Sequence, residues 1–430
     1  MPSRPPSCNS APSKKGSVMY NLQLSSEQLE IRDTVRDFVT REIKPVALKA
    51  ERLDVGDRSL LTDLLDQASQ MGLRSLALSE ERGGAGVDAL TACIATEELA
   101  AGDADIAAVL SESSRLAHLL FDRAMSDAQR DTFLPKFLNS DRYHLAFAGH
   151  EGGTDTRLGV NYHRPASAVA AVKTSAVKSG GDWIVNGVKD CVANAPVAGL
   201  FAVLVNIPGR ASASVLLVPA DAPGVSVRAH DKAWQHGACG EVAFKDCRVP
   251  AGNLLGDDVA TLLTGAAALG RGNPLAQARN LGIGRAAYEA ALDYAHLRVQ
   301  GGRPLIEHQA IATKLAEIAI RLEVARAAVW QAAWASDHPE AIADRSLSDL
   351  PLQSIAQVFA SEAIMKAAKD AAEIFGAMGV MRDMPLQKYI HDARVCQHSG
   401  DGNTDAKLRI AEELASYRRA GNGAMALAGE

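Results

Sequence analysis

The stretch AAEIFGAMGVMRDMPLQKYIHDARVCQHSGDGNT, residues 371–404, joins two helical patterns through a glycine-containing segment and a short polar loop. Gly376 and Gly379 interrupt the apolar period of the first pattern. Asp401 lies in the loop, directly ahead of the next helical pattern. A carboxylate at this point is a general base, a helix N-cap, or neither, because Asp also accepts hydrogen bonds from free backbone N–H groups. The function of the chain depends on which role Asp401 has.

The composition is that of a globular protein. Of 430 residues, 47% are hydrophobic and 22% are charged, and the formal net charge is −6. A negative balance predicts no nucleic-acid partner, and no apolar run is long enough to span a membrane. Residues 1–18 are rich in Pro, Ser and Lys, which predicts a disordered tail rather than a secretory signal.

The cysteines indicate a reducing compartment. None of them has CxxC spacing, so we expect no metal site and a cytoplasmic location. The six are Cys8, Cys93, Cys191, Cys239, Cys247 and Cys396.

Residues 19–142 have the pattern of a helical domain. Ser25-Ser26-Glu27-Gln28 is typical of a capping box that starts a helix. Apolar residues at helical spacing predict further helices at about 59–71, 90–101, 106–124 and 128–138.

Residues 143–255 differ, because their apolar segments are short, rich in Val and separated by turn residues. Seven such segments predict a small β barrel or sandwich. They are 144–148, 168–177, 183–188, 200–205, 214–219, 225–230 and 241–249.

The helical period returns in residues 256–430, where long segments with short connections predict a four-helix bundle. The segments are 259–299, 307–336, 351–379 and 404–419. The expected fold class is therefore α+β, with a helical domain, a β domain and a helical bundle in that order.

Five ordered motifs resemble those of one family. They are LAFAGHEGGTD at 145–155, WIVNGVKDCVAN at 183–194, AFKDCRVPAGNLLG at 243–256, YAHLRVQGGRPLIEHQAIATKLAEIA at 294–319, and the stretch at 371–404. In this order they resemble the acyl-CoA dehydrogenase family over about residues 20–420. The resemblance implies FAD as cofactor, an acyl thioester as substrate, and a homodimer or homotetramer. It also implies an electron-transfer flavoprotein or oxygen as the electron acceptor.

Several cofactor contacts follow from the resemblance. Arg298 matches a position that contacts the FAD pyrophosphate across a subunit boundary, and a guanidinium suits a diphosphate. Gln309 matches a position near the adenine. Glu373 and Gly376 fall on the family's Q-x-x-G-G-x-G pattern, in which glycines let the cofactor approach the backbone. Here Glu373 replaces the glutamine, and a carboxylate would repel a diphosphate.

The loop after residue 147 provides a second group of expected cofactor contacts. Backbone groups of Ala148 and Gly149 match the flavin-binding loop of the family, in which His150 now interrupts the usual Thr-Glu-Pro. Thr154 replaces a serine near the acyl thioester and keeps a hydroxyl donor, so it is expected to contact both cofactor and substrate.

Cys191 and Ala193 stand where the family has Trp and Thr against the flavin, so the cofactor would be held differently. Asn403 and Thr404 complete the cofactor contacts that the resemblance implies. Asn273 replaces an Arg of the family and is expected near the substrate.

The usual glutamate base is missing. The family's Glu-Gly-Thr aligns with Gly400-Asp401-Gly402, and Gly272 occupies the second base position known in some relatives. The string from Asp401 to Thr404 instead resembles the aspartate segment of nitroalkane oxidase, a relative with an aspartate base. Asp401 is thus the expected base, with His398 a further candidate in the same loop.

Three functions remain open from these residues. The first is an FAD-dependent α,β-dehydrogenation of an acyl thioester, carried by CoA or a carrier protein, in which Asp401 removes the α-proton. The second is a flavin oxidase or monooxygenase, and the third is a non-catalytic FAD-binding homologue.

Overall fold

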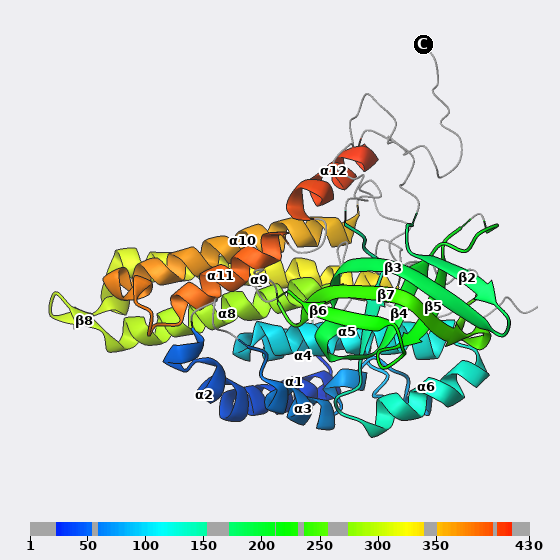
Figure 1. Ribbon diagram of the computed structural model, residues 1–430. Helices are drawn as coiled ribbons and strands as arrows, with labels where there is room; N and C mark the ends of the chain where they lie inside the picture. Colours follow the sequence, from blue (N-terminus) through cyan, green and yellow to red (C-terminus); the bar gives the residue numbers. More distant parts are fainter. Residues whose placement is uncertain are drawn as a thin grey trace, which may run out of the picture.

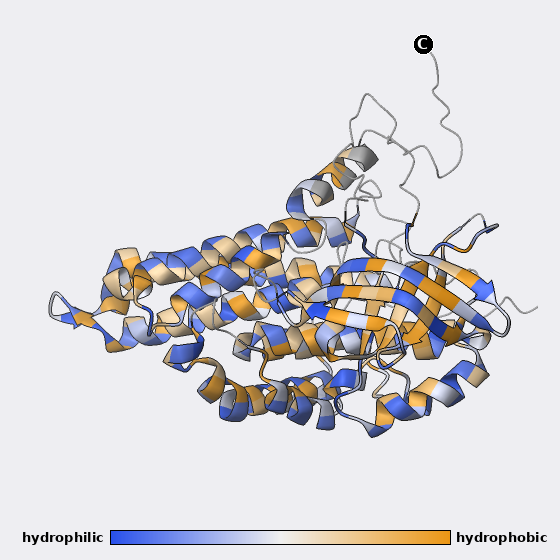
Figure 2. Ribbon diagram, viewed as in Figure 1, coloured by the Kyte–Doolittle hydropathy of each residue, from blue (hydrophilic) through white to orange (hydrophobic). Residues whose placement is uncertain are grey.

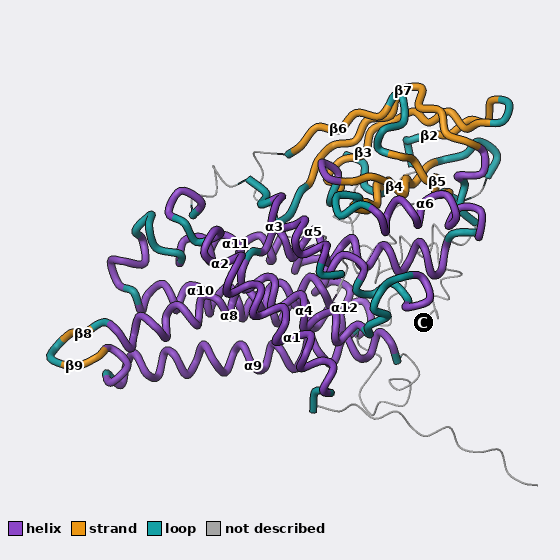
Figure 3. The backbone as a smooth tube through the Cα atoms, turned by 90° about the horizontal axis from the view of Figure 1, so that it is seen from below, coloured by secondary structure: helices purple, strands orange, loops and turns teal. Residues whose placement is uncertain are grey.

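The computed structural model describes residues 23–53, 59–152, 172–210, 212–230, 236–256, 274–338, 351–398 and 402–414. Its described elements form an N-terminal helical domain, a middle β domain and a C-terminal helical domain (Figure 1). The tube in Figure 3 shows the large sheets gathered at one end and the long helices running away from them to the β8–β9 hairpin. The expected fold class is confirmed.

The N-terminal domain begins with the predicted capping box. The Ser25 hydroxyl accepts from the backbone N–H of Gln28, and the Gln28 side chain accepts from the backbone N–H of Ser25. The α-helices are α1 (Ser26–Phe38), α2 (Lys44–Ala47), α3 (Thr62–Gln70), α4 (Ala89–Gly102), α5 (Ala104–Ala117) and α6 (Asp127–Asn139). A π-helical segment, His118–Ala124, continues α5.

Helix α4 is the centre of the helical packing. Nearly all of its residues are buried, including Glu97 and Glu98, because it lies against α1 and α5 and also against α8 (Pro274–Leu297) and α9 (Gln309–Asp337). A helix with no exposed face has no single apolar stripe. In Figure 2 the helices at the surface alternate in hydropathy along their length, as amphipathic helices do.

The β domain consists of two sheets. One has the order β1-β4-β5 and the other the order β2-β3-β7-β6. The strands are β1 (His144–Ala148), β2 (Ser175–Ser179), β3 (Asp182–Ala193), β4 (Ala198–Val205), β5 (Ser214–Pro219), β6 (Val225–Ala229) and β7 (Cys239–Pro250). Their alternate side chains meet in one core, in which Phe201 and Leu216 of the first sheet join Val185 and Val242 of the second.

The predicted segment 168–177 corresponds to β2 only in its last part. Residues 168–171 lie outside the described chain, and 172–174 are not in a strand. The backbone N–H groups of Lys173 and Thr174 donate to the carboxylate of Glu151, so they are not available to a sheet ladder. The strand prediction was therefore too long at its start.

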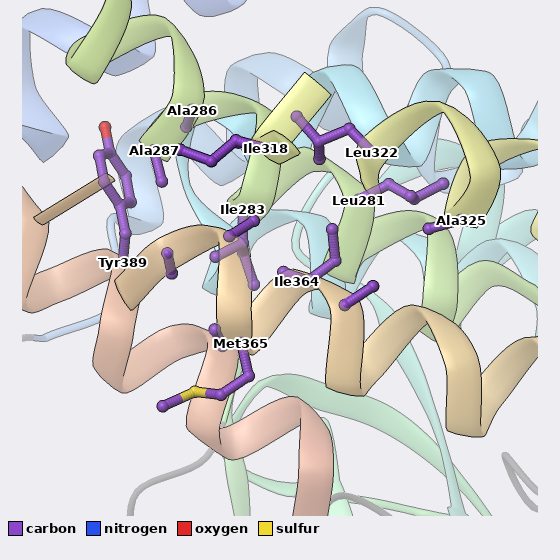
Figure 4. Close-up of a cluster of buried hydrophobic side chains, with 14 of the residues drawn as sticks. Leu281, Ile283, Ala286, Ala287, Ile318, Leu322, Ala325, Ile364, Met365 and Tyr389 are labelled. Atoms are coloured by element: carbon purple, nitrogen blue, oxygen red, sulfur yellow. The ribbon is translucent and has the colours of Figure 1, made fainter. Parts of the chain in front are cut away.

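Four helices form the bundle, and Figure 4 shows part of their common core. They are α8 (Pro274–Leu297), α9 (Gln309–Asp337), α10 (Leu352–Ile374) and α11 (Leu386–His398). Leu281, Ile318, Ile364 and Tyr389 each represent one helix in this core. Between α8 and α9, a hairpin of β8 (Val299–Gln300) and β9 (Arg303–Pro304) extends from the far end.

The sequence assigned the fourth bundle helix to the wrong segment. The predicted helix 404–419 corresponds to α12 (Gly402–Leu414), which packs mainly on α10, whereas α11 supplies Leu386 and Tyr389 to the core. The predicted helix 351–379 was also too long. It ends at Ile374 because Gly376 has φ +57, a left-handed conformation that terminates helices.

Among the described residues, none of the helices combines the length and apolar character that crossing a bilayer requires.

Candidate functional site

An irregularity in β3 determines which side chains face outward. Lys189 pairs with Val242 of β7 and Val192 with Gly240, so β3 has one extra residue in this interval, a β-bulge. Lys189 points into the domain and is fully buried. Within the bulge, Cys191 has φ +50 and is exposed, as is Ala193 two residues on. The structure therefore places these two predicted cofactor contacts on one open face of β3.

The loop after β1 is fixed by a buried ion pair. Ala148 is fully buried at the end of β1, and Gly149 follows it. Glu151 accepts four hydrogen bonds: from Lys189 Nζ at 2.6 Å, from the Thr174 hydroxyl at 2.7 Å, and from the backbone N–H groups of Thr174 and Lys173 at 2.9 and 2.8 Å. Glu151 thus attaches the loop to β3 and to the segment that leads into β2.

This environment controls the charge of Glu151. Burial raises the pKa of the carboxyl group, but hydrogen bonds from Lys189 and Thr174 outweigh burial and lower the pKa to about 2. Burial lowers the pKa of Lys189 as well, and the carboxylate of Glu151 opposes that shift. At neutral pH the loop is held by a full negative charge on Glu151.

Asn194, at the end of β3, connects the β domain to the N-terminal helices. It has φ +64, and its side-chain amide donates to Val109 O and Ser113 Oγ of α5 and to Leu145 O of β1, at 3.1 to 3.2 Å. Because an amide can satisfy buried acceptors on separate elements, this residue fixes the open face of β3 relative to α5.

The start of α12 lies against α10. Asn403 accepts from the Ser361 hydroxyl at 2.9 Å, and Thr404 is exposed. The carbonyl of Gly402 accepts from the Gln357 side chain at 3.4 Å. The structure therefore places Asn403 with α10, and its expected contact with a cofactor stays a prediction.

Some predicted site residues lie outside the described chain. They are Thr154, Gly272, Asn273, Gly400 and Asp401.

Another group of predicted residues meets at the hairpin end of the bundle. Arg298 directly follows α8, Gln309 begins α9, and both are exposed. Stacking of Tyr294 on Phe375, with ring centroids 4.1 Å apart, holds this end of α8 against the end of α10. Arg298, Gln309 and Gly376 are therefore near one another although they are far apart in the sequence.

The charge of Glu373 is neutralised within the chain. Its carboxylate pairs with the ammonium of Lys314 from α9, which lowers the pKa of Glu373. The repulsion of a diphosphate that the sequence suggested is therefore reduced. Among the described residues, no acceptor lies within hydrogen-bonding distance of the Arg298 side chain, so its positive charge is available.

The two groups lie at opposite ends of the bundle. Ser361, next to Asn403, and Glu373 are 12 positions apart on α10, which corresponds to about 18 Å along a helix axis. Figure 1 shows β3 beside the end of α10 on which α12 lies, and the β8 hairpin at the opposite end of the bundle. One molecule therefore does not bring Arg298 to its own β3 face.

Sequence reasoning missed the Glu151–Lys189 pair and the anchoring role of Asn194. A signal for the first was present, since Lys189 has the same strand parity as Trp183 and Val185, both of which are buried. A lysine at an inward position needs a buried carboxylate partner. For Asn194 no such signal exists, because its acceptors come from α5 and β1.

Comparison with known proteins supports the same architecture. The N-terminal, middle and C-terminal domains of acyl-CoA dehydrogenase match residues 25–141, 164–247 and 265–415. An acyl-CoA dehydrogenase of Bacillus subtilis (strain 168) is 31% identical over 399 residues, 91% of this chain and 99% of that protein.

Solved structures have the same fold. Butyryl-CoA dehydrogenase from Megasphaera elsdenii superposes with a TM-score of 0.78 at 25% identity, over 92% of this chain and 100% of that one. A prolyl acyl carrier protein oxidase superposes with a TM-score of 0.74 at 22% identity, over 91% and 100%. The fold and the domain matches define a three-domain oxidoreductase. The chain belongs to the acyl-CoA dehydrogenase family.

Proposed function

We propose that the protein is an FAD-dependent dehydrogenase that introduces an α,β double bond into an acyl thioester. The observation that supports this most strongly is the match along the whole chain to a family whose relatives include an acyl-CoA dehydrogenase and a butyryl-CoA dehydrogenase. The open face of β3 beside the loop at Ala148 and Gly149 supports a planar ring binding there.

Two separate groups of described residues fit two different parts of FAD, the diphosphate and the isoalloxazine ring. Arg298 offers an uncompensated guanidinium for a diphosphate, and no atom lies within 4 Å of the place that a Cβ on Gly376 would take. The face at Cys191 and Ala193 is accessible to the isoalloxazine ring. Because these groups are at opposite ends of one chain, we propose a homodimer in which each flavin lies between two copies.

Each residue then has a defined task. FAD supplies the hydride acceptor, a capacity that no side chain has. Asp401 removes the acidic α-proton of the thioester, and Thr154 donates a hydrogen bond to the developing negative charge on the carbonyl oxygen. The Glu151–Lys189 pair keeps the backbone N–H groups of the loop in position and so excludes water from that side.

An oxidase is the second candidate, because Cys191 leaves that part of the β3 face more open than a tryptophan would. An open face favours access of oxygen to a reduced cofactor. A CoA thioester, a carrier-protein thioester, an electron-transfer flavoprotein and oxygen are therefore the partners to compare. The described cysteines are free thiols, which supports a cytoplasmic location.

The test is anaerobic mixing of the purified protein with a panel of acyl-CoA thioesters. We expect loss of the oxidised-flavin absorbance with at least one of them, and a rate about 10²–10⁴-fold lower in Asp401→Asn, the range for loss of a general base. Asp383→Asn, which removes an exposed carboxylate ahead of α11, is the matched control. Turnover that requires oxygen would instead favour the oxidase, and unchanged bleaching in Asp401→Asn would reject Asp401 as the base.

A further inference from the structure

Three potential metal ligands meet on the open face of β3. The carboxylate of Asp190, the thiol of Cys191 and the imidazole of His230 each offer one ligand atom, and these atoms lie within 4.8 Å of one another. Asp190 Oδ1 and His230 Nε2 are 2.7 Å apart. The three side chains are partly exposed, so an ion from solution has access to them.

The sheet topology explains why these residues converge. Strand β7 lies between β3 and β6, and His230 directly follows β6. The backbone N–H of His230 donates to Cys239 O, and Cys239 pairs with Ala193 across β7 and β3. Asp190 and Cys191 both lie in the bulge of β3, and the ligand atoms of both are within reach of the His230 ring.

The surrounding loop adds a fourth residue of the same chemical kind. The backbone N–H of Asp190 donates to His150 O at 3.0 Å, so His150 lies at the edge of the cluster.

A mixed set of thiolate, imidazole and carboxylate is typical of zinc and similar divalent ions. We propose that Asp190, Cys191 and His230 form a zinc-binding site with the fourth position open to water or to His150. Zinc holds nitrogen and sulfur ligands at about 2.0–2.3 Å, so ligand atoms that lie within 4.8 Å of one another are close enough to converge on a single ion.

The site shares its face with the proposed flavin position, because Cys191 belongs to both. This proposal departs from the expectation of no metal site, which rested on the missing CxxC spacing. The ligands of this site come instead from β3 and from the residue after β6.

Cobalt provides the test, since Co²⁺ takes the place of zinc and a thiolate ligand gives it an intense charge-transfer absorption in the near ultraviolet. The purified full-length chain is titrated with Co²⁺ and then with Zn²⁺. We expect the absorption to appear and Zn²⁺ to abolish it. Cys191→Ser is expected to lose the absorption, and His230→Gln and Asp190→Asn to weaken cobalt binding at least 10-fold.

Cys239→Ser is the control, because this half-buried thiol is outside the cluster. The proposal is rejected if no charge-transfer absorption appears, or if Cys191→Ser keeps it. Circular dichroism of each variant shows whether it is folded, and the three separate ligand variants prevent one misfolded protein from deciding the result. Flavin bleaching by acyl-CoA is measured separately, so the metal site and the proposed function can fail independently.

Discussion

Two regions of the molecule differ in how their charged side chains are paired. One is the junction of α4 with α8 and α9, and the other is the hairpin end of the bundle. At the junction, Glu97 and Glu98 are buried, and Arg285 and Arg326 pair with them at 2.6 to 3.4 Å. At the hairpin end, the Arg298 side chain is exposed, and no described residue pairs with it.

Apolar side chains show the same contrast. Leu297 is 82% exposed and Val380 73% exposed at the hairpin end, whereas the junction is closed on all sides. The chain thus satisfies its junction charges internally, whereas the hairpin end is the exposed region that the proposed dimer would cover. Changes at the junction should reduce stability, and changes at the hairpin end should reduce binding.

The largest expected effect on stability is at the junction. Arg285→Met leaves two buried carboxylates partly unpaired, so we expect the free energy of unfolding to fall by about 3–5 kcal/mol. Arg41→Met, in the π-helical segment Val39–Ile43 that follows α1, should cost less than about 1 kcal/mol, because both partners of its ion pair are exposed. Urea denaturation measures both, and equal losses would contradict the distinction between the two kinds of ion pair.

Arg298→Met is expected to weaken FAD binding without a change in stability. The loss of a charge-assisted contact costs about 1.5–3 kcal/mol, which is roughly a 10–100-fold increase in the dissociation constant. Arg303→Met, in the same hairpin, is the matched control. Fluorescence titration of the flavin-free protein measures both variants. A loss of thermal stability of the flavin-free protein in Arg298→Met would show that the arginine has an internal partner.

Glu151 extends the comparison to the β domain, where a charge is again satisfied internally. Its folded-state pKa of about 2 lies below the ordinary value of 4.5. The ion pair therefore stabilises the fold above about pH 4.5, and the stabilisation is lost as the pH falls toward 2. We expect a loss of about 2 kcal/mol over this window that Glu151→Gln does not show. Denaturation at a series of pH values measures it, and parallel profiles would exclude the carboxylate as the cause.

The smallest effect is expected from the apolar residues of the hairpin end. Leu297→Lys should leave the fold intact, because the side chain is already 82% exposed, and should weaken self-association by about 1–2 kcal/mol. Sedimentation at several concentrations gives the dissociation constant. Ile320→Lys on α9, 62% exposed, compares a different part of the surface. An equal effect of both substitutions would place the interface elsewhere.

Local patterns predicted much of the fold. The Ser25 capping box and the seven strand segments depend on neighbouring residues, and the structure confirms both, except that the second predicted segment begins too early and the third ends too early, since β3 continues to Ala193. The assignment of α11 failed because a short helix after Pro385 has fewer periodic residues than the long helices around it. What brings His230 to Asp190, or Tyr294 to Phe375, is strand order and helix packing, which no local pattern encodes.

The central claim is that the active site is shared by two copies of the chain, and subunit mixing tests it most directly. At an FAD concentration that saturates the wild type but lies well below the dissociation constant of Arg298→Met, Arg298→Met and Asp401→Asn are each expected to be nearly inactive. Mixed and reassociated, they should regain about a quarter of the wild-type activity, since half of randomly assorted dimers are hybrids with one intact site of two. No recovery in verified hybrid dimers would show that Arg298 and Asp401 act within one chain, and would contradict the account.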